Sequence, residues 1–467
     1  MFTLSDPILK KTLRKDKEFL ENTDLPIITV SATYREDLKG LHGLEEIDTT
    51  TDIVFSRAHY SMALGIAIKA WGKKIDPKKA WIVDPTNYVG TKHWSTIVIT
   101  ELIGKILARF KVLKKAKDLV DKFGRQKLPI LESITPPLIY LTKNIKKPIL
   151  SFHIAAGNIL AANGKEVIQV ITDPHVREDY LANAHLPNIK FCVFDEKTRT
   201  EFFEKAAASG KKISDEKIII TGPPVDPRII AAGRDKVPWR KNPLKLCITT
   251  GGLGTNKAEI KDLLDQLMPA LRKKTVPYQV MLYAGTHRDI KDMAIELAKE
   301  NRIKVWEPQL KDPAIFEIDA NLNKVKTKAF VRQALPCRVD NQCPFTVLYH
   351  PQIVDANELL INFAFPWADG FITKPSGDMA YDAAAAGSFL LTLKEWGEWE
   401  HNIRNIFEQK NISREAKIDH IEEQLESLKI ANSTHRSWVE KAMLNALQID
   451  RLFLNGAKNI IKTTMAN

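Results

Sequence analysis

Short apolar runs alternate with longer stretches of helical periodicity along most of this chain. In the first half these runs lie at residues 52–56, 80–84, 149–153, 167–172, 190–194 and 217–221. In the second half they lie at residues 244–250, 278–284, 303–306, 345–349, 368–373 and 389–393. Strands separated by helices are typical of parallel sheets with crossover helices. The two series predict an α/β protein with two Rossmann-like domains.

A proline-rich segment, residues 222–243, separates the two series and lacks apolar periodicity. We therefore expect a domain boundary near residue 235, with domains at 1–235 and 236–433. Residues 434–467 predict a closing C-terminal helix or two. Residues 309–345 interrupt the alternation and are interpreted as an insertion in the second domain. Ligands of such folds bind beyond the carboxyl ends of the strands, so two facing domains would form a cleft.

The composition is ordinary for a soluble globular protein. Of 467 residues, 44% are hydrophobic and 27% are charged, and no apolar run is long enough to span a bilayer. Residues 1–6 lack the basic-then-apolar order of a secretory signal, so we expect a cytoplasmic protein. Cys192, Cys247, Cys337 and Cys343 form no metal-binding pattern, and free thiols are expected. A bridge between Cys337 and Cys343 is the alternative.

The formal net charge of +12 indicates an anionic partner. Nucleic acid, anionic lipid headgroups and phosphorylated substrates all fit that charge. The chain carries no nucleic-acid-binding signature, so a lipid surface is favoured over nucleic acid. Charge alone does not identify the ligand.

The segment from Thr373 to Gly387 carries the most specific chemistry. An apolar strand leads into a Pro-Ser-Gly turn and then into an Ala-rich helix. Free N–H groups at such a helix start, near Ser376 and Gly377, suit a diphosphate, with Lys374 as an added cation. Asp382 would project from the same helix toward a ribose. A plain strand-to-helix turn is the alternative interpretation.

Further motifs follow in order along residues 52 to about 410. They are 170–173, 190–198, 216–226, Gly251-Gly252-Leu253-Gly254 and Gly397-Glu398-Trp399-Glu400-His401-Asn402. In this order the chain resembles lipid-directed glycosyltransferases with two Rossmann-like domains (the GT-B type). It is most similar to the monogalactosyl- and processive diacylglycerol glycosyltransferases and to the N-acetylglucosaminyl transferase of peptidoglycan synthesis. In such transferases the C-terminal helix often crosses back onto the first domain.

The resemblance implies an inverting transfer from a UDP-sugar that requires neither metal nor cofactor. It makes His59 the expected base for the acceptor hydroxyl. Asp173, at a strand end, would orient His59 or bind the acceptor, with a cap on the following turn as the alternative. On the donor side it implies contacts from a set of glycines and polar residues: Gly251, Gly252, Gly254, Lys374, Ser376, Gly377, Asp382, Glu398 and Asn402.

The chain departs from the family pattern at two places. The glycine run that normally precedes the histidine is replaced here by Ser56-Arg57-Ala58. Without those glycines, the backbone of this loop loses the feature that lets it approach a ligand closely. A rearranged loop in which His59 only caps or packs is therefore the alternative. The acid of the donor helix is Asp382 rather than Glu, which shortens its reach by one methylene.

Residues 102–117 combine basic residues with apolar positions at helical spacing and contain no acidic residue. Such a helix can lie on an anionic bilayer. A core-packed helix with a solvated basic face is the alternative. The expected membrane contacts are Lys105, Arg109, Phe110, Lys111 and Lys114.

The sequence therefore predicts a hexosyltransferase that acts on a lipid or membrane-derived hydroxyl acceptor. It would be cytoplasmic and attached peripherally to the inner face of the plasma membrane. A sugar-nucleotide epimerase or hydrolase on the same scaffold, and a catalytically silent nucleotide-sugar-binding protein, are the alternatives. Neither the sugar, the acceptor nor the oligomeric state follows from the sequence.

Overall fold

A computed structural model describes most of the chain and shows two compact units. It describes residues 7–33, 52–72, 74–89, 129–241, 243–273, 277–308, 315–318, 325–328, 343–395, 397–431 and 435–466. Unit 1 comprises Met1–Asp226, Ala314–Val331 and Leu452–Asn467. Unit 2 comprises Pro227–Pro313 and Arg332–Arg451, so the chain passes from one unit to the other at Pro227, against the boundary expected near residue 235.

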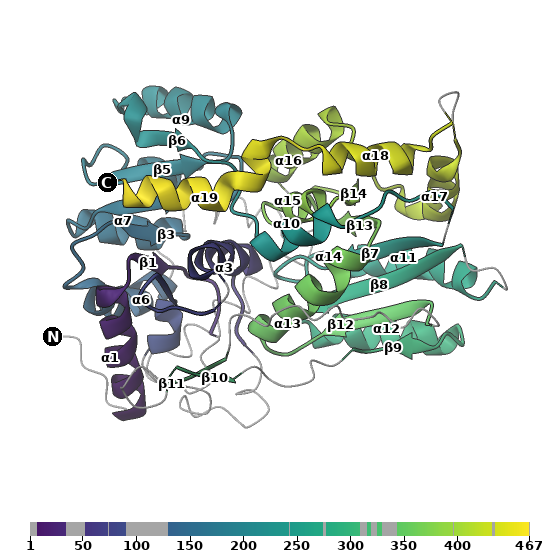
Figure 1. Cartoon of the computed structure of the whole chain (residues 1–467), viewed down its shortest axis with the longest axis horizontal. Coiled ribbons are helices and arrows are strands. Elements are labelled where there is room, and N and C mark those ends of the chain that lie inside the picture. The colour runs from purple at the N-terminus through teal and green to yellow at the C-terminus, as the bar shows by residue number, and fades with distance from the viewer. Residues whose placement is uncertain are drawn as a thin grey trace. The chain divides into compact units, whose positions relative to one another are not determined.

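Unit 1 is built on a six-stranded sheet with the order β2-β1-β3-β4-β5-β6 (Figure 1). Every neighbouring pair is parallel. The strands are β1 (Leu25–Ile28), β2 (Ala80–Val83), β3 (Ile149–Ser151), β4 (Val167–Val170), β5 (Ile189–Val193) and β6 (Ile218–Ile220). All residues of β1 to β4 are buried, as expected for a parallel sheet covered on both faces.

The first strand of unit 1 differs from the sequence prediction. Residues 52–56 do not form a strand, and only Val54 makes an isolated antiparallel bridge, to Ala32. The strand is β1 instead, which carries Pro26. Proline cannot donate to a neighbour, but β1 pairs with β3 only from Ile27 onward, so the missing N–H is tolerated at the strand start.

Helices of unit 1 pack on this sheet around a continuous apolar core. They are α1 (Pro7–Asn22), α3 (Arg57–Trp71), α6 (Pro129–Thr142), α7 (Ile154–Ala162), α8 (Glu178–Leu181), α9 (Glu196–Ala208) and α19 (Arg451–Met465), with short 3₁₀ turns η2 (Pro85–Tyr88) and η5 (Asp215–Lys217). Within the described ranges, no helix is long and apolar enough to cross a membrane.

Unit 2 is built on a seven-stranded parallel sheet with the order β15-β14-β13-β7-β8-β12-β9. The strands are β7 (Leu244–Thr249), β8 (Tyr278–Gly285), β9 (Val305–Trp306), β12 (Phe345–Tyr349), β13 (Gly370–Thr373), β14 (Phe389–Thr392) and β15 (Ser413–Glu415). The expected fold class, two Rossmann-like α/β domains, is thereby confirmed.

Helices cover this sheet as well (Figure 1). They are α10 (Pro227–Arg234), α11 (Lys257–Leu271), α12 (Arg288–Glu300), α13 (Ile353–Leu359), the π-helical segment η6 (Leu360–Ala364), α14 (Phe365–Trp367), α15 (Met379–Ala385), α16 (Glu398–Gln409), η7 (Ile418–His420), α17 (Ile421–Lys429) and α18 (Trp438–Leu447). Between β9 and β12, where an insertion is expected, β10 (Ile315–Ile318) and β11 (Val325–Lys328) form an antiparallel pair.

The C-terminal helix α19 packs closely against the last segment of unit 1 before the crossover. A Cβ atom at Gly456 would lie 2.0 Å from the carbonyl oxygen of Pro223, so only glycine allows this contact. The Asn459 side chain donates to the carbonyl of Thr221 at 2.9 Å. The end of the chain is therefore part of unit 1.

Strand order reverses once in each sheet, and these two places define where ligands are expected. In unit 1 the reversal lies between β1 and β3, and in unit 2 it lies between β7 and β13. Connections leave such neighbouring strands toward opposite faces of the sheet, which opens a crevice at their carboxyl ends. The residues that follow β1, β3, β7 and β13 are therefore the ones to compare with the predicted site.

Candidate functional site

In unit 1, His59 lies in the first turn of α3 with a defined ring orientation. Ser56 caps the helix, and its Oγ accepts from the His59 backbone N–H at 3.3 Å. The His59 Nδ1 atom lies 3.3 Å from the carbonyl oxygen of Val30, just beyond β1. Because a carbonyl only accepts, Nδ1 carries the proton, and Nε2 is the basic nitrogen of the neutral ring. This tautomer suits a general base.

A second histidine, His153, lies beside His59 at the same reversal of strand order. The two ring centroids are 5.3 Å apart and the rings meet edge to face at 81°. His153 follows β3 and occupies the N-cap position of α7. Sequence reasoning missed it, although its place at the end of the apolar run 149–153 was the available signal. The structure thus brings two imidazoles to the point where an α/β unit is expected to bind its ligand.

The loop that leads to His59 is held by a buried carboxylate, Asp84, after β2. One of its oxygens accepts from the backbone N–H groups of Ser31 and Ala32, at 2.6 and 3.1 Å, and from the Ser31 hydroxyl at 2.9 Å. The other accepts from the Thr86 N–H and hydroxyl. Burial raises the pKa of Asp84 to about 6, although these hydrogen bonds act in the opposite direction.

The hydrogen bonds continue from Asp84 toward α3. The Ser31 carbonyl accepts from the N–H groups of Phe55 and Ser56, at 2.7 and 3.1 Å. Ser56 is the cap of the helix that carries His59. Asp84 therefore fixes the segment that replaces the expected glycine run, and sequence reasoning missed it because its partners lie about 50 positions away.

Asp173 lies three residues beyond β4, next to Arg177. The pKa of the Arg177 guanidinium is lowered by burial but raised overall by the nearby Tyr180, Asp173 and Asp179. The Asp173 carbonyl also accepts from the His175 N–H at 2.7 Å. This hydrogen bond closes the tight turn that follows Asp173, where a capping role was the alternative interpretation. Asp173 thus has an electrostatic partner in its own loop, and its catalytic role stays a prediction.

In unit 2, the glycine turn after β7 is fixed by side chains on both sides. Asn256 accepts from the Gly251 N–H at 3.0 Å and donates to the Thr249 carbonyl at 3.0 Å. His287, which follows β8, donates from Nε2 to the Gly252 carbonyl at 3.1 Å. Gly254 has φ +65, a left-handed conformation that favours glycine. The turn is therefore preformed, and its Gly252 N–H has no hydrogen-bond partner within the described residues.

Lys374 lies directly after β13, on the other side of the same reversal. The Thr249 hydroxyl donates to that of Thr373 at 2.6 Å, which ties the ends of β7 and β13 together. Lys374 is only 8% exposed, and its Nζ lies 3.9 Å from Glu400 Oε2. Lys374 thus follows the strand that lies next to the one leading into the glycine turn.

The start of α15, where an anion site is predicted, carries a carboxylate of its own. The helix runs only from Met379 to Ala385, and the carboxylate of its N-cap residue Asp378 accepts from the Met379 N–H at 2.7 Å. Asp378 also accepts from the Ser376 hydroxyl at 2.7 Å. A carboxylate therefore stands at this helix start, and the donor contacts at Ser376 and Gly377 stay a prediction. Asp382 is 6% exposed on the same helix.

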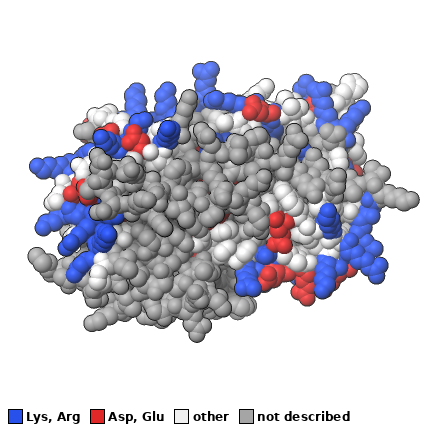
Figure 2. Space-filling view, turned by 60° about the horizontal axis from the view of Figure 1, so that its bottom comes forward, with Lys and Arg blue, Asp and Glu red and all other residues white. Residues whose placement is uncertain are grey.

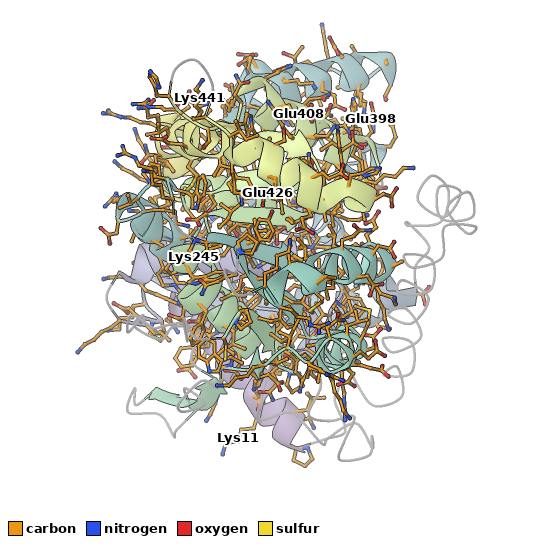
Figure 3. The ribbon with its side chains drawn as sticks, turned by 90° about the vertical axis from the view of Figure 1, so that its right-hand side faces the viewer. Lys11, Lys245, Glu398, Glu408, Glu426 and Lys441 are labelled. Carbon is orange, nitrogen blue, oxygen red and sulfur yellow. The ribbon has the colours of Figure 1, made fainter. Side chains whose placement is uncertain are left out.

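Helix α16 carries the predicted donor contacts Glu398 and Asn402, and it presents a third polar residue, Glu400, to Lys374. Glu398, the predicted contact, is exposed, and Asn402 is half-buried. Glu400 is 7% exposed and is the acid whose side chain approaches Lys374. Figure 3 labels Glu398 near one end of α16 and Glu408 farther along the same helix. Helical phase, which the motif match ignored, decides which residue faces inward.

Other predictions fall partly or wholly outside the described residues. The membrane contacts Lys105, Arg109, Phe110, Lys111 and Lys114 lie outside them, as does Cys337. Cys192 and Cys247 are free and buried, and Cys343 is buried. Among the described residues, no cluster of three or more His, Cys, Asp or Glu could hold a metal ion. Figure 2 shows many Lys and Arg side chains on the described part of one face.

Comparisons with known proteins give structural likeness only. No protein-family model matches the chain, and no curated protein matches its sequence. The fold is similar to MurG of Acinetobacter baumannii, with 11% identity, a TM-score of 0.45, and coverage of 95% of this chain and 100% of that one. It is also similar to UDP-GlcNAc 2-epimerase from Neisseria meningitidis bound to UDP-GlcNAc, with 10% identity, a TM-score of 0.47, and coverage of 95% and 100%.

A third similar structure is UGT71G1 of Medicago truncatula complexed with UDP-glucose. Its identity is 11%, its TM-score is 0.46, and the match covers 94% of this chain and 98% of that one. At identities near 10% and TM-scores below 0.5, these likenesses assign neither activity nor substrate to the chain. Functional conclusions therefore depend on the residues at the two strand-order reversals.

Proposed function

We propose that this protein transfers a hexose from a UDP-sugar to a hydroxyl acceptor of lipid or membrane origin, with inversion and without a metal. One observation carries the proposal. In each unit the residues suited to this chemistry lie at the reversal of strand order, with His59 and His153 in unit 1 and the glycine turn and Lys374 in unit 2.

The acceptor chemistry would use unit 1. Transfer to a hydroxyl needs a base for its proton, and His59 holds its Nδ1–H on the Val30 carbonyl so that Nε2 can accept. The edge-to-face contact with His153 limits rotation of the ring. Asp173 would act on the acceptor, and the nearby positive charge of Arg177 favours a role in binding over proton abstraction.

The donor chemistry would use unit 2. The departing diphosphate would be met by the Lys374 ammonium and by the glycine turn at Gly251, Gly252 and Gly254, so no metal is needed for charge compensation. Asp382 would accept hydrogen bonds from the ribose hydroxyls. Glu398 and Asn402 remain candidates for contacts to the donor sugar. Glu400 is the residue of this helix whose side chain lies near Lys374.

Radiolabelled UDP-sugars incubated with the protein and mixed lipid extracts test this function. We expect label to move into the lipid fraction, and to do so only when the proposed site residues are intact. Turnover of the donor in the absence of any acceptor would instead indicate an epimerase or hydrolase. A protein that binds UDP but turns over no donor would be the catalytically silent alternative.

A lipid acceptor also requires contact with a membrane, which we assign to residues 102–117. This segment should bind anionic vesicles more tightly at low salt, because its attraction is screened over about 8–10 Å at physiological ionic strength. Changing Lys111, Lys114 and Lys115 to Glu should abolish sedimentation with such vesicles and leave UDP binding intact. Unchanged sedimentation would favour the core-packed reading and a soluble acceptor.

A further inference from the structure

Two side chains of α9, Glu201 and Lys205, hold the loop that follows β4. The Glu201 Oε2 atom accepts from the backbone N–H of Val176 at 3.1 Å. The Lys205 ammonium donates to the carbonyl oxygen of the same residue at 2.6 Å. Glu201 and Lys205 also pair with each other at 2.7 Å, one helical turn apart. Both backbone groups of Val176 are therefore bonded to one helix, and we call this arrangement the α9 clamp.

Glu201 is the centre of the α9 clamp and is ionised at neutral pH. Its Oε1 atom, which pairs with Lys205, also lies 3.0 Å from Nδ1 of His175. Burial alone would raise the pKa of Glu201, but the contacts with His175 and Lys205 lower it to about 2. A hydrogen bond to an ionised group is stronger than one between neutral groups. The bond from the Val176 N–H to this carboxylate is therefore a strong restraint on the loop.

The clamped loop carries a residue that the acceptor would meet. Asp173 lies three positions before Val176, and Arg177 follows Val176 directly. Arg177 is the N-cap residue of α8, whose last residue is Leu181. Lys211, which follows α9, donates to the Leu181 carbonyl at 2.5 Å. The segment from Asp173 to Leu181 is thus held by contacts with α9 and with the residues just beyond it.

We propose that Glu201 is a positioning residue for acceptor binding, because it fixes the backbone that carries Asp173. The inference rests on the proposed function, which assigns Asp173 to the acceptor. β4 runs parallel to β3, so the clamped loop leaves the sheet at the same edge as His153, which follows β3. Asp173 interacts electrostatically with Arg177 as well, and the α9 clamp acts on the backbone between these two residues. A loop that is already ordered lowers the entropy cost of binding.

Hydrogen exchange of the full chain tests the α9 clamp without any substrate. Glu201→Ala removes the acceptor of the Val176 N–H, so peptides that span residues 174–181 should exchange about ten- to hundredfold faster than in wild type. Glu201→Gln keeps one acceptor oxygen and loses the charge, so its exchange rate should lie between those of wild type and Glu201→Ala. Glu204→Ala is the matched control, because Glu204 is an exposed position of the same helix. Its exchange should match that of wild type.

The rate of transfer from a radiolabelled UDP-sugar, measured against the concentration of mixed lipid extract, tests the positioning role. Glu201→Ala should raise the half-saturating concentration of the extract by roughly three- to tenfold, because a preordered loop acts on acceptor binding. The maximal rate should stay close to that of wild type. Glu201→Gln should recover part of the loss, and Glu204→Ala should show none. UDP affinity, which depends on unit 2, should not change.

The two measurements separate failure of this inference from failure of the proposed function. If Glu201→Ala does not fold, Glu201→Gln serves for both. Unchanged exchange over residues 174–181 in a folded Glu201 variant would overturn the α9 clamp. Faster exchange with an unchanged half-saturating concentration would show a purely structural role and overturn the positioning role. A wild type that transfers no label at any extract concentration would instead overturn the proposed function, while the exchange rates would still decide on the clamp.

Discussion

At the scale of single residues, backbone contacts decide what the candidate side chains can do. His59 was identified from a resemblance, but its suitability as a base comes from the Val30 carbonyl, which fixes the proton on Nδ1. His153, Asp84 and Glu400 were not identified at all. Each acquires its role from a partner distant in sequence, as Asp84 does from Ser31, and such pairings are not encoded in local spacing.

Replacing His59 with alanine should lower turnover by about two to four orders of magnitude, because a general base acts on the transition state. UDP affinity should stay close to that of wild type, since the donor contacts proposed here belong to unit 2. Steady-state kinetics together with UDP titration check both expectations. A variant that retains half of the wild-type rate would remove His59 from this role, and His153→Ala would then be the next substitution to measure.

Titration of Asp84 should make unit 1 less stable as the pH rises. Its pKa is about 6 in the folded protein against 3.8 in the unfolded chain, so between these values the folded state binds more protons. The contribution is present below about pH 4 and is lost as the pH rises to about 6, at a cost of up to about 3 kcal/mol. Above about pH 6, where Asp84 is ionised in both states, this loss of stability should level off.

Chemical denaturation at several pH values, in wild type and in Asp84→Asn, measures this effect. The variant cannot titrate at this position, so the stability difference between wild type and variant should fall as the pH rises from 4 to 7. A difference that is constant, or that grows with pH, would show that the hydrogen bonds from Ser31, Ala32 and Thr86 dominate over burial.

At the scale of elements, apolar periodicity located most strands but not their partners. The runs at 80–84, 149–153 and 244–250 became β2, β3 and β7 with small changes at their ends. The run at 52–56 looked similar but makes only one bridge, because β1 takes the place beside β2 and β3. Which runs become neighbours is set by long-range packing, and local patterns do not specify it.

Helix α19 offers a test of element packing that does not depend on the proposed chemistry. A side chain at Gly456 would collide with the Pro223 backbone, so Gly456→Val should destabilise unit 1 by about 1–3 kcal/mol, as overpacking usually does. A lower midpoint of thermal unfolding is the expected result. Gly210→Val is a useful comparison for added bulk, because no atom lies within 4 Å of a Cβ there, although its φ of +68 adds backbone strain. Equal stability of Gly456→Val and wild type would contradict the packing described for α19.

At the scale of the whole molecule, the two-domain α/β class followed from the sequence because alternation of strands and helices is a global pattern. The anion site at the start of α15 stays a prediction, and Asp378 caps this short helix. Lys374 and the glycine turn, also predicted as donor contacts, follow the neighbouring strands β13 and β7. The order of the motifs thus predicted the fold class, whereas the burial of single side chains such as Glu398 and Glu400 depends on helical phase.

Titration of the full chain with UDP, in wild type and in Asp382→Ala, tests the central claim most directly. The claim is that unit 2 binds a nucleotide-sugar donor at the reversal between β7 and β13. Wild type should bind UDP, and loss of a carboxylate that accepts from ribose hydroxyls should cost about 1.5–3 kcal/mol of binding free energy. A folded Asp382→Ala variant that binds UDP as tightly as wild type, or a wild type that does not bind UDP, would contradict the claim.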